Sequence, residues 1–407
     1  MFEHLASPIL IFFAIILAVP SFILLLECLA GAMGGDPTPG ATSGPRPRLA
    51  VLVPAHDEES GIGATVTALR TDLAAGDFVL VVADNCSDGT AAVAAGAGAR
   101  VIERRDPLQR GKGFALAFGI KHLAANPPQV VVVVDADCRV AAGGVERLAH
   151  RALVTGRPVQ AEYLLRPPLH PDSRTAISGL ALVVRNQVRP RGLWRLHLPC
   201  PLTGSGMAFA WALLRDAPAL NGNLVEDMAL GIELAIRGSP PLPCPEVAVW
   251  SELPEGGRAQ LVQRRRWEHG HLATLLAQGP RLLAVGLMRL RIDLVAMALD
   301  LMVPPMALLV MLIGTVTAAS LLAWFFGALR LPLLLALAST GAVGLAVLVA
   351  WLRFARSALS MGSLLAVPLY LAWKLPLYLG YLVRGRHKNW ERTARTSVKT
   401  DSATPPT

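Results

Sequence analysis

The chain carries little charge for its length: Asp, Glu, Lys and Arg make up 16% of its 407 residues, against 53% hydrophobic residues. The mean hydropathy of +0.48 excludes an ordinary soluble protein and an intrinsically disordered one. The 36 glycines and 31 prolines follow no period, which excludes collagen-like repeats. The five cysteines are odd in number, widely separated and without CxxC spacing. The sequence therefore predicts neither a disulfide framework nor a zinc site, and is typical of a protein exposed to a reducing cytosol.

The first long hydrophobic run, residues 8–26, is uncharged and long enough to cross a hydrocarbon layer of roughly 30 Å. No Lys or Arg precedes it and no small-x-small cleavage site is evident, which favours a retained membrane anchor at 1–30 over a cleaved signal peptide. The first basic residues after it are Arg46 and Arg48. By the positive-inside rule, they predict that the chain after residue 30 lies in the cytosol.

Two further uncharged runs, 301–329 and 331–352, are separated only by Arg330. They predict a transmembrane hairpin over 301–352 with both ends in the cytosol.

The last apolar run, 357–383, has basic residues on both sides and is interrupted by Pro368, Lys374 and Pro376. A simple crossing would place the basic tail, 384–407, outside the cell. We therefore favour a broken re-entrant or interfacial segment followed by a cytosolic tail, with a fourth spanning helix as the alternative.

A less hydrophobic block at 46–255 alternates β-branched runs with Ala-rich stretches, the rhythm of an α/β fold with a mostly parallel sheet. A helical stretch at 256–300 then leads to the membrane, and we expect interfacial helices there. The predicted strands are 49–53, 78–83, 100–102 and 130–134. A polar cluster follows each strand, and ligands of open α/β sheets collect at the carboxyl ends of strands.

Asp135 and Asp137 come directly after five valines, so both carboxylates are expected at the exit of a buried strand with Ala136 turned away. Two carboxylates suit a hard divalent cation such as Mg²⁺, and the alternative is a solvated turn that caps the next helix. Asp84 ends another buried strand and is a candidate to bind a nucleotide base or ribose. Asp88 is expected to cap the helix that begins near Thr90.

Three further segments offer groups for a phosphorylated ligand. Lys112 belongs to an RGKG sequence that suits phosphate but lacks Walker spacing, and a basic surface turn would look the same. Gly204 lies in a glycine-bearing loop where backbone can approach a ligand, as in any plain turn. Glu226 and Asp227 stand in the first turn of a predicted helix over 224–238, where the helix dipole alone favours acidic residues.

The segment QRRRW places Gln263, Arg266 and Trp267 at i, i+3 and i+4, hence on one helix face. A guanidinium suits a departing pyrophosphate and an indole suits stacking on a sugar ring. The alternative is interfacial anchoring, because Arg and Trp both favour the lipid headgroup zone.

Taken together, these motifs resemble membrane-embedded family 2 glycosyltransferases, in the group that contains cellulose, hyaluronan, chitin and poly-N-acetylglucosamine synthases. The resemblance covers about residues 48–275, and the tail sequence WERTAR (390–395) is also similar. It implies a glycosyltransferase-A-type, Rossmann-like fold at the inner or plasma membrane. The motifs that carry it, in the family's order, are PAHDE (54–58), ADNCSDGT (83–90), RGKG (110–113), DAD (135–137), TGSGMAF (203–209), ED (226–227) and QRRRW (263–267).

The resemblance also implies roles for single residues. Asp227 would be the catalytic base, and Asp135 with Asp137 would bind the nucleotide-sugar and its Mg²⁺ or Mn²⁺. The other donor-binding residues would be Glu58, Asp84 and Lys112. The acceptor and the pyrophosphate would be held by Gln263, Arg266, Trp267, Gly204 and Glu226. Two positions depart from the family pattern: His56-Asp57 replaces Tyr-Asn, and Val225 replaces Thr before Glu226.

The implied reaction is inverting transfer of a sugar, in the first place from a UDP-sugar, to a growing membrane-associated polysaccharide. A single transfer to a lipid acceptor is the alternative, and a transporter or a catalytically silent scaffold is the alternative of another class. Expected partners are membrane lipids and a second copy or an export protein. Nucleic acid is not expected as a partner despite the net charge of +9, because the basic residues form no stripe interleaved with aromatic residues. The expectation that carries this account is that Asp84, Asp137 and Asp227 meet in one cavity beneath Trp267.

Overall fold

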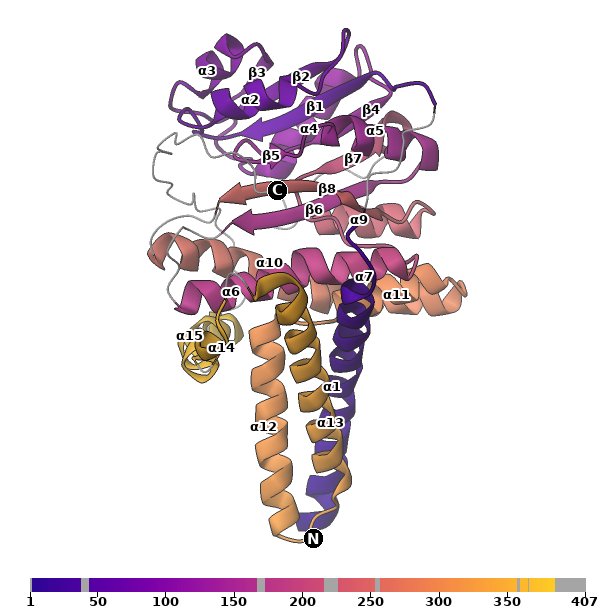
Figure 1. Cartoon of the computed structure of the whole chain (residues 1–407), viewed down its shortest axis with the longest axis vertical. Helices are drawn as coiled ribbons and strands as arrows, with labels where there is room; N and C mark the ends of the chain where they lie inside the picture. The colour runs from indigo at the N-terminus through magenta and orange to yellow at the C-terminus, as the bar shows by residue number, and fades with distance from the viewer. Residues whose placement is uncertain are drawn as a thin grey trace.

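The computed structural model describes residues 2–37, 44–166, 173–215, 226–252, 257–356, 359–364 and 366–384. Figure 1 shows three levels along the long axis: an α/β unit at one end, a layer of helices lying across the axis, and long helices that reach the N-terminus at the other end.

The α/β unit contains an eight-stranded sheet in the order β3-β2-β1-β4-β7-β6-β8-β5. Its first four strands pair in parallel, whereas β7 runs antiparallel to both of its neighbours and β5 antiparallel to β8. The strands are β1 (Leu49–Ala55), β2 (Phe78–Asp84), β3 (Arg100–Arg104), β4 (Val130–Val133), β5 (Arg139–Val140), β6 (Val159–Arg166), β7 (Met207–Ala210) and β8 (Leu242–Glu252). The predicted α/β fold class is confirmed, and the four predicted strands are present with ends that shift by one or two residues.

Helices cover both faces of this sheet, which explains why its central strands are continuously hydrophobic. Alternate valines of β4 enter opposite cores: Val130 and Val132 join one, Val131 and Val133 the other. The first core contains α2 (Ile62–Arg70), α3 (Thr90–Gly96) and α5 (Gly144–Thr155), and the second contains α4 (Lys112–Leu123), α8 (Trp211–Arg215) and α9 (Glu226–Ile236).

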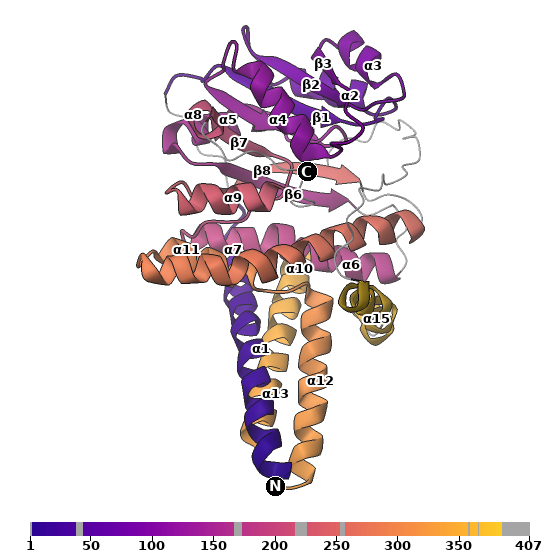
Figure 2. The ribbon, with the colours of Figure 1, turned by 180° about the vertical axis from the view of Figure 1, so that it is seen from behind.

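The transverse layer connects the sheet to the long helices (Figure 2). Helix α9 is apolar on two sides: Leu230 and Leu234 pack on the sheet, whereas Met228 and Ile232 pack on α10 and α11. The helix that begins at Glu226 is thus fixed between two layers. The elements of the transverse layer are α6 (Ser173–Val183), the π-helical turn η1 (Val184–Val188), α7 (Arg189–Arg195), α10 (Gly257–Met288) and α11 (Ile292–Leu301).

The long helices are α1 (Phe2–Ala32), α12 (Met306–Phe325) and α13 (Leu331–Ala350), the last continued by a π-helical turn, η2 (Trp351–Ala355). Within the described residues, three segments are long and apolar enough to cross a membrane: Ser7–Ala32, Met306–Phe325 and Leu331–Ala355. They coincide with the predicted anchor and hairpin, except that the first helix of the hairpin begins later than residue 301. Pro304 and Pro305 end the preceding helix there, because proline cannot continue the hydrogen-bond pattern of a helix.

The predicted third apolar segment forms α14 (Met361–Leu364) and α15 (Val367–Arg384). Figures 1 and 2 show α15 end-on beside the transverse layer, so its axis crosses that of α12. This orientation favours the interfacial placement over a fourth spanning helix, and the position in a membrane stays a prediction. The tail from residue 385, including WERTAR, lies outside the described residues.

Helix α1 crosses α7 at very short range because a glycine stands on each side. A Cβ atom at Gly31 would lie 2.1 Å from a backbone oxygen of η1, and one at Gly192 would lie 2.1 Å from the backbone oxygen of Glu27. Arg189 bridges the same junction: its Nε lies 2.6 Å from Glu27 Oε2, and its Nη2 lies 2.6 Å from Asp300 Oδ1. The first long helix is thereby fixed to the transverse layer.

Candidate active site

Lys112, Asp135, Gly204 and Asp227 come together at the carboxyl ends of the central strands. The Lys112 ammonium forms an ion pair with Asp135 and donates a hydrogen bond of 2.6 Å to the backbone oxygen of Gly204. A Cβ atom at Gly204 would lie 3.1 Å from Asp227 Oδ2 and 3.3 Å from Lys112 Nζ. The Asp227 carboxylate and the Lys112 ammonium thus border Gly204, and Asp135 joins them through its ion pair with Lys112, although these residues are far apart in the sequence.

Local structure explains how each of these residues reaches the cluster. Lys112 is the first residue of α4, Asp135 follows β4, and Asp227 stands in the first turn of α9. Gly204 has φ +96°, a conformation that residues with a Cβ atom rarely adopt, and the missing side chain leaves the space that the Asp227 carboxylate and the Lys112 ammonium border. The predicted approach of this loop's backbone to a ligand stays a prediction.

Asp135 and Asp137 offer the oxygen atoms that a divalent cation needs. Candidate ligand atoms of Asp135, Asp137 and Cys138 all lie within 4.8 Å of one another. Ala136 is buried between the two partly exposed aspartates, as predicted. Burial, followed by the charges of Asp137 and Asp135, raises the pKa of the Cys138 thiol well above its usual value. The thiol is therefore neutral, and the donor set consists of carboxylates, which fits a hard ion such as Mg²⁺ or Mn²⁺.

Asp84 lies two strands away, at the end of β2, and is buried. Its Oδ1 accepts hydrogen bonds from Arg104 Nη1 at 2.6 Å and from Asn85 Nδ2 at 3.1 Å, while its backbone oxygen lies 2.7 Å from His56 Nδ1. Sequence reasoning missed Arg104. Arg104 could have been found from the register of the two strands, because the parallel alignment of β2 and β3 pairs Asp84 directly with Arg104.

A second acidic group, Asp57, Cys86 and Asp88, links the loops after β1 and β2. Asp88 Oδ1 accepts a hydrogen bond of 3.0 Å from the backbone of Thr90, the first residue of α3, so the predicted cap is present. Asp57 accepts a hydrogen bond of 2.6 Å from the loop after β2, and the backbone of Glu58 donates one of 2.8 Å to the Thr90 hydroxyl. These bonds hold the two loops together around Glu58.

The QRRRW segment lies on α10. Gln263 is buried, and its Oε1 has no hydrogen-bond partner in the part of the chain that the structure describes. Trp267 lines a cavity of about 770 Å³ between the transverse layer and the long helices, and the lining of this cavity includes none of Asp84, Asp137 and Asp227. Trp267 therefore contacts the cavity at the long helices, and a cavity shared by Asp84, Asp137 and Asp227 beneath Trp267 stays a prediction. The side chain of Glu226 lies outside the described residues.

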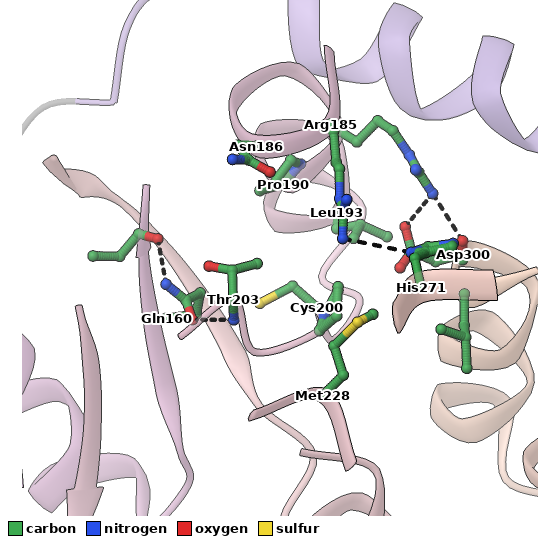
Figure 3. A pocket seen from close by; sticks show the side chains of 14 residues that line it. Gln160, Arg185, Asn186, Pro190, Leu193, Cys200, Thr203, Met228, His271 and Asp300 are labelled. Atoms are coloured by element: carbon green, nitrogen blue, oxygen red, sulfur yellow. Dashed lines mark hydrogen bonds and ion pairs between the residues drawn. The ribbon is translucent and has the colours of Figure 1, made fainter. Parts of the chain in front are cut away.

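A second cavity, of about 540 Å³, lies next to the carboxylate cluster (Figure 3). Its lining includes Thr203 and Met228, the sequence neighbours of Gly204 and Asp227, together with Arg185 and His271. Arg185 Nη2 lies 3.5 Å from His271 Nδ1, and Figure 3 draws this contact across the cavity. Sequence reasoning missed both residues, since neither belongs to a motif.

The electrostatic surroundings of Asp227 suit a base. Burial raises the pKa of its carboxyl above the usual value, the Lys112 ammonium opposes this shift, and the negative charge of Asp135 adds to it. A carboxylate with a raised pKa accepts a proton more readily at the pH where an enzyme works. The arrangement can therefore place a proton acceptor beside an anion-binding lysine.

A mixed α/β sheet that presents carboxylates at its carboxyl ends, with helices on both faces, is the glycosyltransferase-A fold. The profile of the family described as Glycosyltransferase like family 2 matches residues 45–270, more than half of the chain. The chain belongs to this family.

Relatives and solved structures agree with this assignment. An uncharacterized glycosyltransferase of Mycobacterium tuberculosis is 38% identical over 114 residues, which cover 27% of this chain and 48% of the relative. Glucosyl-3-phosphoglycerate synthase of Mycolicibacterium paratuberculosis is 36% identical over 96 residues, 22% of this chain and 28% of that enzyme. The chain spans about half or less of the length of these curated relatives. Mannosyltransferase PcManGT of Pyrobaculum calidifontis, solved with GDP-Man and Mn²⁺, has a similar fold, with TM-score 0.50, 17% identity, and coverage of 90% of this chain and 99% of that one.

Proposed function

We propose that this protein is a membrane-bound, metal-dependent glycosyltransferase that transfers a sugar from a nucleotide-sugar, in the first place a UDP-sugar, with inversion. The observation that carries the proposal is the cluster of Lys112, Asp135 and Asp227 around Gly204. It puts a proton acceptor next to groups that suit a phosphorylated donor, at the sheet edge where α/β proteins bind ligands.

The chemistry requires a base and a stabilised leaving group. An acceptor hydroxyl is a weak nucleophile, so Asp227 takes its proton as the oxygen attacks the anomeric carbon. The bond from that carbon to the nucleoside diphosphate breaks on the opposite side, and a single displacement inverts the configuration. The positive charges of Lys112 and Arg266 stabilise the negative charge that grows on the diphosphate. Asp84 and Glu58 contact the nucleoside portion.

Asp135 and Asp137 would hold a divalent cation, as judged from the carboxylate donor set described above. Bound there, Mg²⁺ or Mn²⁺ supplies positive charge that neutralises the phosphates of the donor. The mannosyltransferase of similar fold was solved with Mn²⁺ and GDP-Man, which supports the choice of ion and the class of donor.

Two acceptors remain in consideration. The motif QRRRW favours a growing polysaccharide, with Gln263 and Trp267 at the acceptor end. The cavity at Trp267, which residues of α1 and α12 also line, favours a lipid acceptor. The apolar segments of α1, α12 and α13 support a location in the membrane with the α/β unit in the cytosol.

A donor panel tests this function. Purified full-length protein is incubated with UDP-, GDP- and TDP-sugars, with and without Mg²⁺ or Mn²⁺, and nucleotide release is measured. We expect release from one donor class that requires the metal, and the absence of release from every donor would contradict the proposal. With a radiolabelled donor, products of many lengths on a gel indicate polysaccharide synthesis, and products with one added sugar indicate transfer to a lipid.

A further inference from the structure

The two cavities described above share a wall formed by Arg185, Arg189 and His271. One cavity is lined by Thr203 and Met228, the sequence neighbours of Gly204 and Asp227. The other lies at the end of the long helices, where Leu24 of α1 and Met306 of α12 line it. Together the two cavities extend from the candidate membrane spans to Met228, the sequence neighbour of the candidate catalytic base.

The three cations of the membrane-side cavity differ in how their charge is balanced. Arg189 pairs with Glu27 and Asp300, and Lys374 of α15 pairs with Glu268 of α10. Arg185 makes no ion pair within the described ranges. Among the residues that the structure describes, no carboxylate therefore pairs with the Arg185 guanidinium.

The hydrogen-bond partner of Arg185 is a neutral histidine ring. His271 Nε2 lies 3.1 Å from the backbone oxygen of Val303, so the neutral ring donates there and presents Nδ1 to Arg185. Burial, followed by the positive charges of Arg185 and Arg189, lowers the pKa of His271 to about 3. Burial, followed by the positive charge of Arg189, lowers the pKa of Arg185, while the negative charges of Asp227, Glu268 and Asp300 oppose this shift. A bound anion would relieve both effects.

The backbone at Arg185 is unusual as well. Val184–Val188 forms a π-helical turn between two α-helices, an arrangement that proteins use mostly at functional sites. The turn directs Arg185 into the wall between the two cavities, whereas Val184 and Val188 enter the apolar core of the long helices. A regular helix would distribute these three side chains differently.

We propose that the membrane-side cavity binds an amphiphile whose phosphodiester or diphosphate pairs with Arg185, with the apolar tail toward α1 and α12 and a hydroxylated head toward Asp227. A guanidinium is the side chain best suited to phosphate, because it donates two parallel hydrogen bonds. This inference rests on the proposed function and names the chemistry of its acceptor.

The transfer step balances with such an acceptor. The hydroxyl oxygen of the head group bonds to the anomeric carbon, the bond from that carbon to the nucleoside diphosphate breaks, and the hydroxyl proton passes to Asp227. The phosphate that Arg185 binds takes no part in bond formation. It fixes the distance between the bilayer and the reacting hydroxyl.

Lipid binding to the full-length protein, measured by native mass spectrometry without a donor, tests the proposal. The probes are phosphatidylglycerol, a polyprenyl diphosphate N-acetylglucosamine, and ceramide, which has hydroxyls but no phosphate. We expect at least one of the two phosphate-bearing lipids to bind about tenfold or more tightly than ceramide. The better of these two identifies the source of the phosphate.

Variants distinguish the contribution of the Arg185 charge to lipid binding from that of the cavity's shape. We expect Arg185→Gln to weaken binding of the phosphate-bearing lipid by about 10- to 100-fold and Arg185→Lys to restore part of it. Ala307→Phe, which fills the cavity without changing its charge, should also weaken binding. The matched control is Arg289→Gln, at an exposed arginine after α10, which should bind as wild type does.

Equal binding of ceramide, or unchanged affinity in Arg185→Gln, would overturn the proposal. Because binding is measured without a donor, it does not depend on catalysis. Intact lipid binding in a protein that releases no nucleotide from any donor would refute the proposed function instead.

Discussion

Two groups of buried or partly buried charged residues in this molecule differ in the ratio of carboxylates to cations and in their contacts. At the junction of α1, α7 and α11, Glu27 and Asp300 each face the Arg189 guanidinium at 2.6 Å. At the ends of the central strands, Asp135 and Asp227 lie near the single ammonium of Lys112, with Asp137 close by. At the junction two carboxylates both contact one cation, whereas at the strand ends three carboxylates gather near one ammonium that pairs with Asp135.

The difference indicates what each group does. Buried ion pairs with short, well-directed hydrogen bonds fix the position of one helix against another, and they stabilise little beyond that. Clustered carboxylates repel one another, and such an arrangement persists where a cation or a proton transfer makes use of it. The junction is therefore structural, and the strand ends are the candidate for chemistry.

The largest expected effect is on transfer in Asp227→Asn. Removal of the proposed base should lower the rate of transfer by about 10²- to 10⁴-fold. The folded-state pKa of Asp227 is raised above the unfolded value of 3.8, so stability falls as the pH rises from the unfolded pKa to the folded-state pKa and stays lower above it. The neutral Asn should therefore unfold at pH 7 no earlier than wild type, and the difference should vanish in acid where Asp227 is protonated. An unchanged rate of transfer would remove Asp227 from the mechanism.

Loss of the junction cation should affect stability instead. Arg189→Ala leaves Glu27 and Asp300 buried without their partner, which costs about 3–5 kcal/mol. The thermal unfolding midpoint in detergent should fall by several degrees. Adding Glu27→Gln and Asp300→Asn should recover much of the loss, and no recovery would argue against a purely electrostatic cause.

Protonation of His271 should make the folded protein less stable in acid. Its folded-state pKa of about 3 lies below the unfolded value of 6.5, so the unfolded chain binds the proton first and stability falls as the pH drops below 6.5. The loss reaches on the order of 3 kcal/mol at pH 4. His271→Gln should reduce this acid sensitivity, whereas His122→Gln, at an exposed histidine of α4, should not. Equal acid sensitivity in all three proteins would contradict the assignment.

A smaller effect is expected from Gly204→Ala. The substitution forces a Cβ atom into a left-handed conformation and to within 3.1 Å of Asp227 Oδ2, which costs about 1–2 kcal/mol. Transfer should fall about tenfold while the fold persists. Gly143→Ala provides the control, because Gly143 also has positive φ but its added Cβ would meet no atom within 4 Å. A similar loss of transfer in both variants would show that backbone strain, and not the contact with Asp227, is responsible.

Sequence reasoning predicted those parts of the fold whose signal is local. The valine run of β4 and the uncharged stretch of α1 can each be recognised within a short segment of sequence. The ends of the predicted strands also place Asp84, Asp135 and Asp137 at one edge of the sheet. Arg185 could not be predicted, because its importance arises from the approach of α6, α10 and α12, which are distant in sequence. The direction of Trp267 is also a tertiary property, since a helix face can turn toward the sheet or toward the membrane with the same residues.

Binding of Mn²⁺ in the presence of UDP, measured by electron paramagnetic resonance, tests most directly that the strand ends hold a metal-bound nucleotide. We predict UDP-dependent binding that Asp137→Asn weakens at least tenfold and that Asp88→Asn, in the second acidic group, leaves unchanged. Wild-type binding in Asp137→Asn, or its loss in Asp88→Asn, would contradict the account.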